Sequence, residues 1–300
     1  MDPISVAVER AGLVEAEHRV HAVSVRDGKV AEAWGDPGLV TFMRSAAKPI
    51  QALSLVRTCG DLGEEELAIA CASHGAEPEQ LAAVEALLAR SGSSEDDLEC
   101  GPENGRRLRH NCSGKHAGML CTCAERGWER HGYRLPEHPL QRELLALVEE
   151  TAESVVENTA IDGCGVVTFA LTLASMANGF ARLAKEEVAG GREVVAAMTG
   201  HPELVEGRGR AATEVMRALP GAVAKGGAEG LLCVGLPDGT GHALKVEDGA
   251  SRATGPAAGL ILGLSALAET PLENSRGEEV GKSALPLFHL SCRIILRMCL

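Results

Sequence analysis

Aromatic side chains are scarce in this sequence of 300 residues, which contains two Trp, one Tyr and four Phe. Because so few rings are available, the interior has to be filled by aliphatic side chains, mainly Ala, Leu and Val. Hydrophobic residues make up 45% of the chain, which is ordinary for a globular protein with a large buried core. The sequence also lacks internal repeats and linker-like segments, so we expect a single domain over residues 1–281.

Basic residues are also few relative to acidic ones. The chain has 29 Lys and Arg against 42 Asp and Glu, so its net charge is −13. This balance argues against nucleic acid and anionic membranes as partners. The start, Met1-Asp2-Pro3, lacks the basic and apolar segments of a secretion signal, and no apolar run approaches the roughly 20 residues of a spanning helix. We therefore expect a cytoplasmic protein whose ten cysteines are free thiols or metal ligands.

The last segment, residues 282–300, lacks Asp, Glu and Gly, although the rest of the chain is rich in all three. Three interpretations are open: a native C-terminal strand, a basic segment that touches a membrane, or an altered tail such as one from a shifted reading frame. We favour the altered tail.

Hydrophobic patterning predicts a mixture of strands and helices. A hairpin is expected within residues 19–34, since Asp27-Gly28-Lys29 has the composition of a tight turn. The other strands are expected at residues 4–9, 39–42, 231–236 and 242–246. The main helices are expected at residues 64–70, 79–91, 139–159, 168–184 and 257–268.

A serine and a lysine three residues apart, Ser45 and Lys48, lie where a short strand leads into a predicted helix. At this spacing two side chains share one helix face, roughly 5–6 Å apart at Cβ. A neutral lysine amine can then take the proton of a serine hydroxyl, which makes the hydroxyl a nucleophile. Serine β-lactamases and penicillin-binding proteins use the same spacing. Taken alone, the pair is also compatible with an ordinary helix start that carries a solvated lysine.

Four further turns combine small residues with polar side chains. They are Ala72-Ser73-His74-Gly75, His110-Asn111-Cys112-Ser113-Gly114-Lys115-His116, Asp162-Gly163-Cys164-Gly165 and Lys225-Gly226-Gly227-Ala228-Glu229. Glycines in such turns let the backbone approach a ligand closely.

Together and in this order, the five motifs resemble the Rhizobium etli-type L-asparaginases, the asparaginase II or class 3 group, up to about Gly281. The resemblance implies an α+β fold similar to that of serine β-lactamases and penicillin-binding proteins, with an antiparallel sheet packed against helices, usually in a homodimer. It implies hydrolysis of L-asparagine to L-aspartate and ammonia. Val167 departs from the family pattern, which has Pro there.

The resemblance also implies a role for each matching position. The catalytic positions, two Ser–Lys pairs, are Ser45, Lys48, Ser73 and Lys225. The positions that hold a zinc ion are Cys112, Lys115 and Cys164. The positions next to the substrate are Arg44, His116 and Asp162. We expect the zinc ion to support substrate binding and not to generate the nucleophile.

The chemistry of amide hydrolysis assigns Ser45 as the best nucleophile with Lys48 as its base. Ser73 either relays a proton or attacks the amide itself, and the sequence leaves both open. The backbone amides of Ser45 and of Gly226-Gly227 are candidate oxyanion donors. Alternative functions are a zinc-held β-lactamase-like hydrolase and a non-catalytic small-molecule binding protein, with Cys112 and Cys164 as structural thiols in the simplest case.

Overall fold

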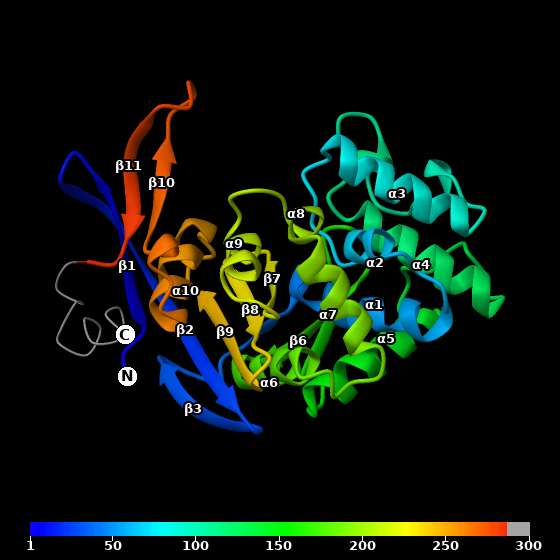
Figure 1. Ribbon diagram of the computed structural model, residues 1–300, viewed down its shortest axis with the longest axis horizontal. Coiled ribbons are helices and arrows are strands. Elements are labelled where there is room, and N and C mark those ends of the chain that lie inside the picture. The colour runs from blue at the N-terminus through cyan, green and yellow to red at the C-terminus, as the bar shows by residue number, and fades with distance from the viewer. Residues whose placement is uncertain (287–300) are drawn as a thin grey trace.

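The computed structural model describes residues 1–286, and an antiparallel sheet of eight strands runs through it. The strand order is β10-β11-β1-β2-β9-β8-β7, with β3 paired to β2. The strands of this sheet are β1 (Ile4–Arg10), β2 (Leu13–Arg26), β3 (Lys29–Trp34), β7 (Val223–Gly227), β8 (Leu231–Gly235), β9 (Thr240–Val246), β10 (Glu269–Glu273) and β11 (Glu279–Ala284). In Figure 1 the strands β1, β10 and β11 lie on one side of the molecule, and helices α1–α4 lie on the other.

A second, smaller sheet has the order β4-β6-β5, and its strands are β4 (Val40–Phe42), β5 (Asn158–Ile161) and β6 (Val167–Thr172). Ten α-helices occur within residues 1–286. They are α1 (Lys48–Thr58), α2 (Glu64–Ala70), α3 (Pro78–Arg90), α4 (Ser113–Arg126), α5 (Pro139–Ala152), α6 (Leu173–Ala184), α7 (Gly191–Gly200), α8 (Pro202–Val205), α9 (Ala211–Ala218) and α10 (Thr254–Leu262). The α+β class and the antiparallel sheet packed with helices are confirmed.

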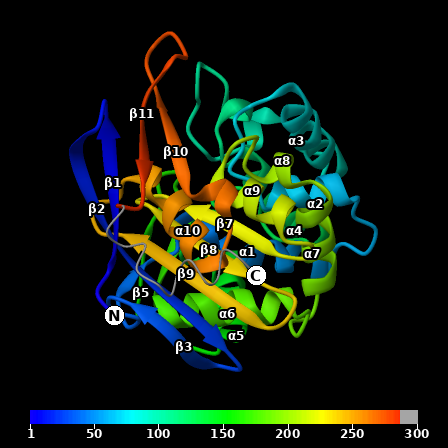
Figure 2. The ribbon, with the colours of Figure 1, turned by 60° about the vertical axis from the view of Figure 1, so that its left-hand side comes forward.

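Helix α6 lies directly against β8 and β9 (Figure 2). Two glycines make this close contact possible. A Cβ on Gly241 would lie 1.9 Å from the carbonyl oxygen of Ala177, and a Cβ on Gly235 would lie 2.0 Å from that of Phe180. The helix backbone therefore packs on the sheet without intervening side chains at these points, and the apolar face of α6 closes the core.

The hairpin of β2 and β3 confirms the predicted turn, since Asp27 and Gly28 both have positive φ values. The helix predicted over 168–184 is wrong in its first part, which is strand β6. Val167, Thr168 and Phe169 are β-branched or aromatic and favour a strand, and a short apolar run does not separate strand from helix by periodicity. The side chain of Thr172 then accepts a hydrogen bond from the Ser175 amide and begins α6.

The helix predicted over 139–159 ends early, at Ala152, because Glu153 adopts a left-handed conformation with φ 50°. Residues 158–161 form strand β5 instead. The helix predicted over 257–268 is α10, which begins at Thr254 and ends at Leu262, where Gly263 has φ 69°.

Residues 282–284, the beginning of the unusual tail, lie in strand β11 between β1 and β10. Ser283 is fully buried there. Residues 287–300, which carry most of the tail, lie outside the described residues. Within residues 1–286, no helix combines the length and apolar character needed to cross a bilayer.

Candidate active site

The first Ser–Lys pair lies at the junction of β4 and α1. A short 3₁₀ turn, Arg44–Ala47, precedes α1, and Arg44 has φ 50°, a left-handed conformation that costs energy for a residue with a side chain. The turn is held by β6, because the amide of Met43 donates to the carbonyl of Phe169 at 2.8 Å and that of Arg44 to Thr168 Oγ1 at 3.1 Å. A strained residue thus directly precedes Ser45.

Lys48 is fully buried at the start of α1, and its amine points to the segment after α2. Its Nζ atom donates to Ser73 Oγ at 2.9 Å and to the carbonyl of Ala72. Burial lowers the pKa of Lys48, and the nearby Lys225 and Lys115 lower it further against the opposing effect of Cys112. This environment favours the neutral amine, the form in which a lysine can act as a base.

Lys225, on β7, is also fully buried and approaches the same serine from the eight-stranded sheet. Its Nζ atom donates to Ser73 Oγ at 2.9 Å and to the carbonyl of Gly226 at 3.1 Å. The Ser73 hydroxyl thus lies between two buried lysine amines. The structure brings Lys48, Ser73 and Lys225 together from segments that are up to 177 positions apart in the sequence numbering.

Glu206, which the sequence analysis missed, completes this cluster. Its Oε1 atom accepts hydrogen bonds from Lys225 Nζ and from the Gly226 amide, the latter at 2.7 Å. A Cβ on Gly226 would lie only 2.9 Å from this oxygen, so a larger residue would push the carboxylate aside. The only local signal was the turn Gly207-Arg208-Gly209 that follows Glu206.

The bond from Glu206 to the Gly226 amide changes one expectation. This N–H group was a candidate oxyanion donor, but it is already engaged by the carboxylate. Ser45, Gly226 and Gly227 all line the cavity, and of their amides that of Ser45 lies at the start of a helical segment.

Ser45 and Ser73 line one open cavity of about 970 Å³. Other lining residues come from the loop before α9, from the start of α10 and from β10. Within residues 1–286, no hydrogen bond joins Ser45 to Lys48, whose amine is directed to Ser73. Both serines are half-buried, so each is open to a molecule in the cavity.

Cys112, Lys115 and Cys164 meet as the motifs suggested. Lys115 and its neighbour Cys112 lie at the start of α4, and Lys115 Nζ is 3.1 Å from Cys164 Sγ. A hydrogen bond with the Cys164 thiol lowers the pKa of Cys112 well below its usual value, and Lys48 adds to this effect. The same bond and burial raise the pKa of Cys164. Burial alone would lower the pKa of Lys115. The nearby Cys164 and Cys112 outweigh this effect, and the pKa of Lys115 is raised.

This donor set fits a zinc ion. The two thiols and the amine are all buried and in contact, and the lowered pKa of Cys112 favours the thiolate that zinc binds. The amine of Lys115 would have to give up its proton to bind the metal. Within residues 1–286, no group of three or more His, Cys, Asp or Glu side chains could hold a metal, and the third donor here is the lysine.

Two of the expected substrate neighbours, Arg44 and Asp162, form an ion pair. Arg44 Nε donates to Asp162 Oδ1 at 2.5 Å, and the side chains are 27% and 9% exposed. The same oxygen accepts from the amide of Gly163 at 2.7 Å. Asp162 is therefore both the turn residue of its loop and the partner of the residue before Ser45.

His116, the third expected neighbour, is fully buried on α4. Its Nδ1 atom is 2.6 Å from Tyr133 Oη, which accepts a hydrogen bond from the Glu99 amide. Burial lowers the pKa of His116 well below its ordinary value, with Lys115 adding to the effect. Its Nε2 atom has no partner among the described residues. The ring is thus a neutral group next to Lys115, fixed from behind by Tyr133.

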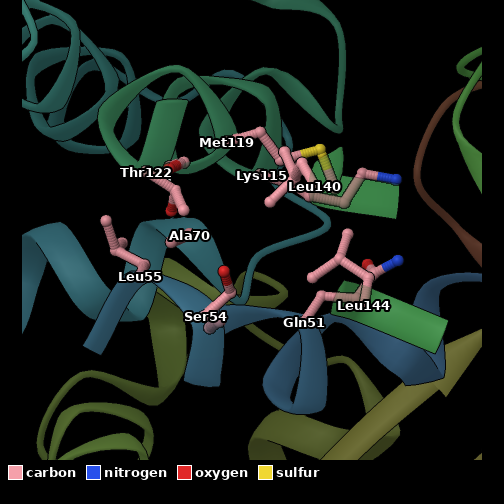
Figure 3. Close-up of a pocket in the computed structure, with 11 residues that line it drawn as sticks. Gln51, Ser54, Leu55, Ala70, Lys115, Met119, Thr122, Leu140 and Leu144 are labelled. Atoms are coloured by element: carbon pink, nitrogen blue, oxygen red, sulfur yellow. Dashed lines mark hydrogen bonds between the residues drawn. The ribbon is translucent and has the colours of Figure 1, made fainter. Parts of the chain in front are cut away.

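A much smaller space lies among α1, α4 and α5 (Figure 3). Its volume of about 10 Å³ corresponds to roughly one water molecule. Gln51 and Ser54 on α1 and Lys115 on α4 contribute to its wall. Gln51 Oε1 has no hydrogen-bond partner among the described residues, so a water there would satisfy it. This space is too small for a substrate.

The Ser73 hydroxyl lies between two buried amines at the wall of an open cavity. Such an arrangement can activate a serine for nucleophilic attack. The family model for L-asparaginase II matches residues 6–284, and the chain belongs to this family. Membership supports an asparaginase-type amidohydrolase function.

Solved structures of a protein named Mglu are also similar to the chain. The structure of Mglu in its tris and glutamate form shares 16% identity at a TM-score of 0.36, covering 85% of this chain and 61% of that one. The native form in the presence of 4.3 M NaCl shares 15% identity at a TM-score of 0.39, covering 88% and 66%. The chain thus spans less than two thirds of the length of the first of these proteins. No curated protein matches the chain.

Proposed function

We propose that the protein is an L-asparaginase that hydrolyses L-asparagine to L-aspartate and ammonia through an acyl-enzyme. The observation that carries this proposal is the Ser73 hydroxyl, 2.9 Å from the amines of both Lys48 and Lys225 at the wall of a cavity that Ser45 shares. Such a cluster can activate a serine and return its proton to a leaving amine.

In this proposal Ser45 is the nucleophile. It follows the strained Arg44, faces the cavity and lies one helical turn before Lys48. Ser73 is already engaged by two amines, which suits a relay better than an attacking group. Lys48 takes the proton of Ser45 as the new C–O bond forms. Ser73 and Lys48 then pass this proton to the amide nitrogen as the C–N bond breaks and ammonia leaves.

Water completes the reaction by the same route in reverse. It attacks the ester carbonyl, gives a proton to the amine of Lys48 and restores the Ser45 hydroxyl. The Lys225 ammonium stabilises the negative charge that develops, and the Ser45 amide binds the oxyanion. Asp162, oriented by Arg44, binds the α-ammonium group of the substrate, and His116 supports this end of the site.

We further propose that Cys112, Lys115 and Cys164 hold a zinc ion. When bound, zinc would supply positive charge that helps to bind a carboxylate or amino group of the substrate. The protein residues perform the proton transfers, since Lys48 and Ser73 already form a hydrogen-bonded pair.

The test is an assay of ammonia release from asparagine and from glutamine, combined with trapping of the acyl-enzyme by rapid acid quench. Peptide mapping by mass spectrometry should place the aspartyl ester on Ser45, and Ser45→Ala should yield no ester. An ester on Ser73 would reverse the two roles. Turnover of a chromogenic β-lactam without turnover of asparagine would identify a β-lactamase-like hydrolase. No turnover of either by the intact chain would identify a binding protein.

The metal proposal makes a separate prediction. The purified protein should contain about one zinc per chain by elemental analysis, and Cys112→Ser and Cys164→Ser should each lose most of it, because each removes a thiolate ligand. Cys59→Ser is the matched control, since this cysteine also packs in the core but lies apart from the set. Full zinc content in both site variants would contradict the assignment.

A further inference from the structure

One arginine on the cavity wall is held from behind by a buried histidine. Arg252 lies in the 3₁₀ turn Ser251–Ala253 before α10, and its Nε atom donates to His18 Nε2 at 2.9 Å. His18 is 4% exposed, and its Nδ1 atom lies 2.6 Å from Asp248 Oδ2. The ring therefore accepts from Arg252 and donates to Asp248. This arrangement fixes the Nε edge of the guanidinium, while its two terminal nitrogens form no hydrogen bond among residues 1–286.

Charged side chains of both signs line the cavity. Three lining carboxylates have cationic partners: Glu206 pairs with Lys225, Glu214 with Arg217 and Glu269 with Lys282. Two lining arginines, Arg210 and Arg252, have no carboxylate partner among residues 1–286. Glu103 is the remaining lining carboxylate. Arg217 is shared between Glu214 and Glu203, so the lining groups and their partners carry no net charge. An anion in the cavity would therefore meet Arg252 itself as the local positive charge.

The cavity is larger than free asparagine requires. Its volume of about 970 Å³ lies at the upper end of the range, roughly 300–1,000 Å³, that holds drug-sized ligands. Among the described residues, its lining includes neither Arg44 nor Asp162, which hold the amino-acid end of the substrate in the proposed reaction. Ser45, where the carbonyl lies in the proposed reaction, shares this cavity with residues of α10 and β10, so the cavity offers space for a substituent on the amide nitrogen.

We propose that the protein also hydrolyses N-substituted asparagine amides, the β-aspartyl peptides, whose leaving amine carries a carboxylate that Arg252 binds. This proposal rests on the proposed amidohydrolase function. The chemistry is unchanged: the C–O bond to Ser45 forms, the C–N bond breaks, and the leaving amine takes the proton that ammonia would otherwise take. Water then releases aspartate. Only the leaving group differs, and no further reactant is needed.

The experiment measures aspartate release by the full-length protein from β-aspartyl-glycine, β-aspartyl-diglycine and β-aspartyl-triglycine, which vary the reach of the carboxylate. The matching N-alkyl asparagines, which lack the carboxylate, serve as probes of size alone. We expect kcat/KM for the best peptide to fall roughly 10- to 100-fold in Arg252→Gln, because one charge-assisted interaction is lost. The N-alkyl probes and free asparagine should be unaffected. Arg192→Gln, on the exposed surface of α7, is the control and should change nothing.

The outcomes separate the two proposals. Turnover of asparagine without turnover of any β-aspartyl peptide would overturn the inference and leave the asparaginase proposal intact. Equal loss of the peptide and its N-alkyl analogue in Arg252→Gln would also overturn it, since the effect would not depend on the carboxylate. Failure of the wild-type protein to release ammonia from asparagine, with the fold intact by circular dichroism, would refute the proposed function itself.

Discussion

Replacing Lys48 by methionine is expected to lower kcat for asparagine by roughly 10²- to 10⁴-fold, the contribution typical of a positioned general base. The amine is fully buried and lies 2.9 Å from Ser73 Oγ, so no solvent base can take its place. Methionine keeps the length and apolar stem of the side chain, and the core around Ile50 and Leu53 should remain packed. Ammonia release measures the loss, and circular dichroism checks the fold.

The pH dependence of the wild-type protein provides a second measurement of the same residue. Burial lowers the pKa of Lys48, and the active form is the neutral amine. Activity should therefore rise with pH as Lys48 loses its proton, and this limb of the kcat/KM profile should be missing from any residual activity of Lys48→Met. Lys29→Met, at an exposed position of β3, is the control and should keep the full profile.

The free energy of unfolding should also rise with pH because of Lys48. Because the folded-state pKa of Lys48 lies below its unfolded value of 10.5, the unfolded chain binds more protons between these two values. The stability of the wild-type protein should therefore rise with pH across that window relative to Lys48→Met. The variant should be at least as resistant to urea as the wild type at neutral pH, since it no longer buries an amine. Marked destabilisation with normal turnover would show that Lys48 is a structural residue.

The sequence indicates a candidate site because the polar residues involved are concentrated in short, recognisable motifs. Ser45 and Lys48 share a helical turn, and Cys112 and Lys115 share another, so their proximity follows from local geometry. The hairpin of β2 and β3 was predictable for the same reason, because Asp27 and Gly28 determine it locally. Each of these features depends on residues within a few positions of one another.

The remaining features depend on packing between distant segments, which spacing does not reveal. The segment that follows α2 places Ser73 next to the amine of Lys48. This segment is held in place because the Ser73 amide donates a hydrogen bond to the Val205 carbonyl at 2.7 Å. Glu206 follows Val205 in the loop between α8 and α9, and its carboxylate accepts a hydrogen bond from Lys225. A glutamate beside a glycine-rich turn has no periodicity or motif that distinguishes it from a solvated residue.

Removing the carboxylate of Glu206 is therefore expected to have the largest effect on stability. Glu206→Ala leaves the ammonium of Lys225 buried without its partner, and breaking a buried ion pair in this way costs about 3–5 kcal/mol. It also frees the amide of Gly226. Urea denaturation should show this loss in the free energy of unfolding, with asparagine turnover reduced as Lys225 shifts away from Ser73. Glu214→Ala removes a partly exposed carboxylate of α9 and is the matched control, which should change stability little.

A double variant tests the cause of this loss. If the unpaired charge of Lys225 is responsible, adding Lys225→Met to Glu206→Ala should recover a large part of the lost stability, because no uncompensated charge then remains in the core. Activity should not recover, since the amine next to Ser73 is gone. A double variant no more stable than Glu206→Ala alone would show that Glu206 acts through the loop backbone and not through Lys225. Glu206 and Lys225 would then contribute independently to stability and to catalysis.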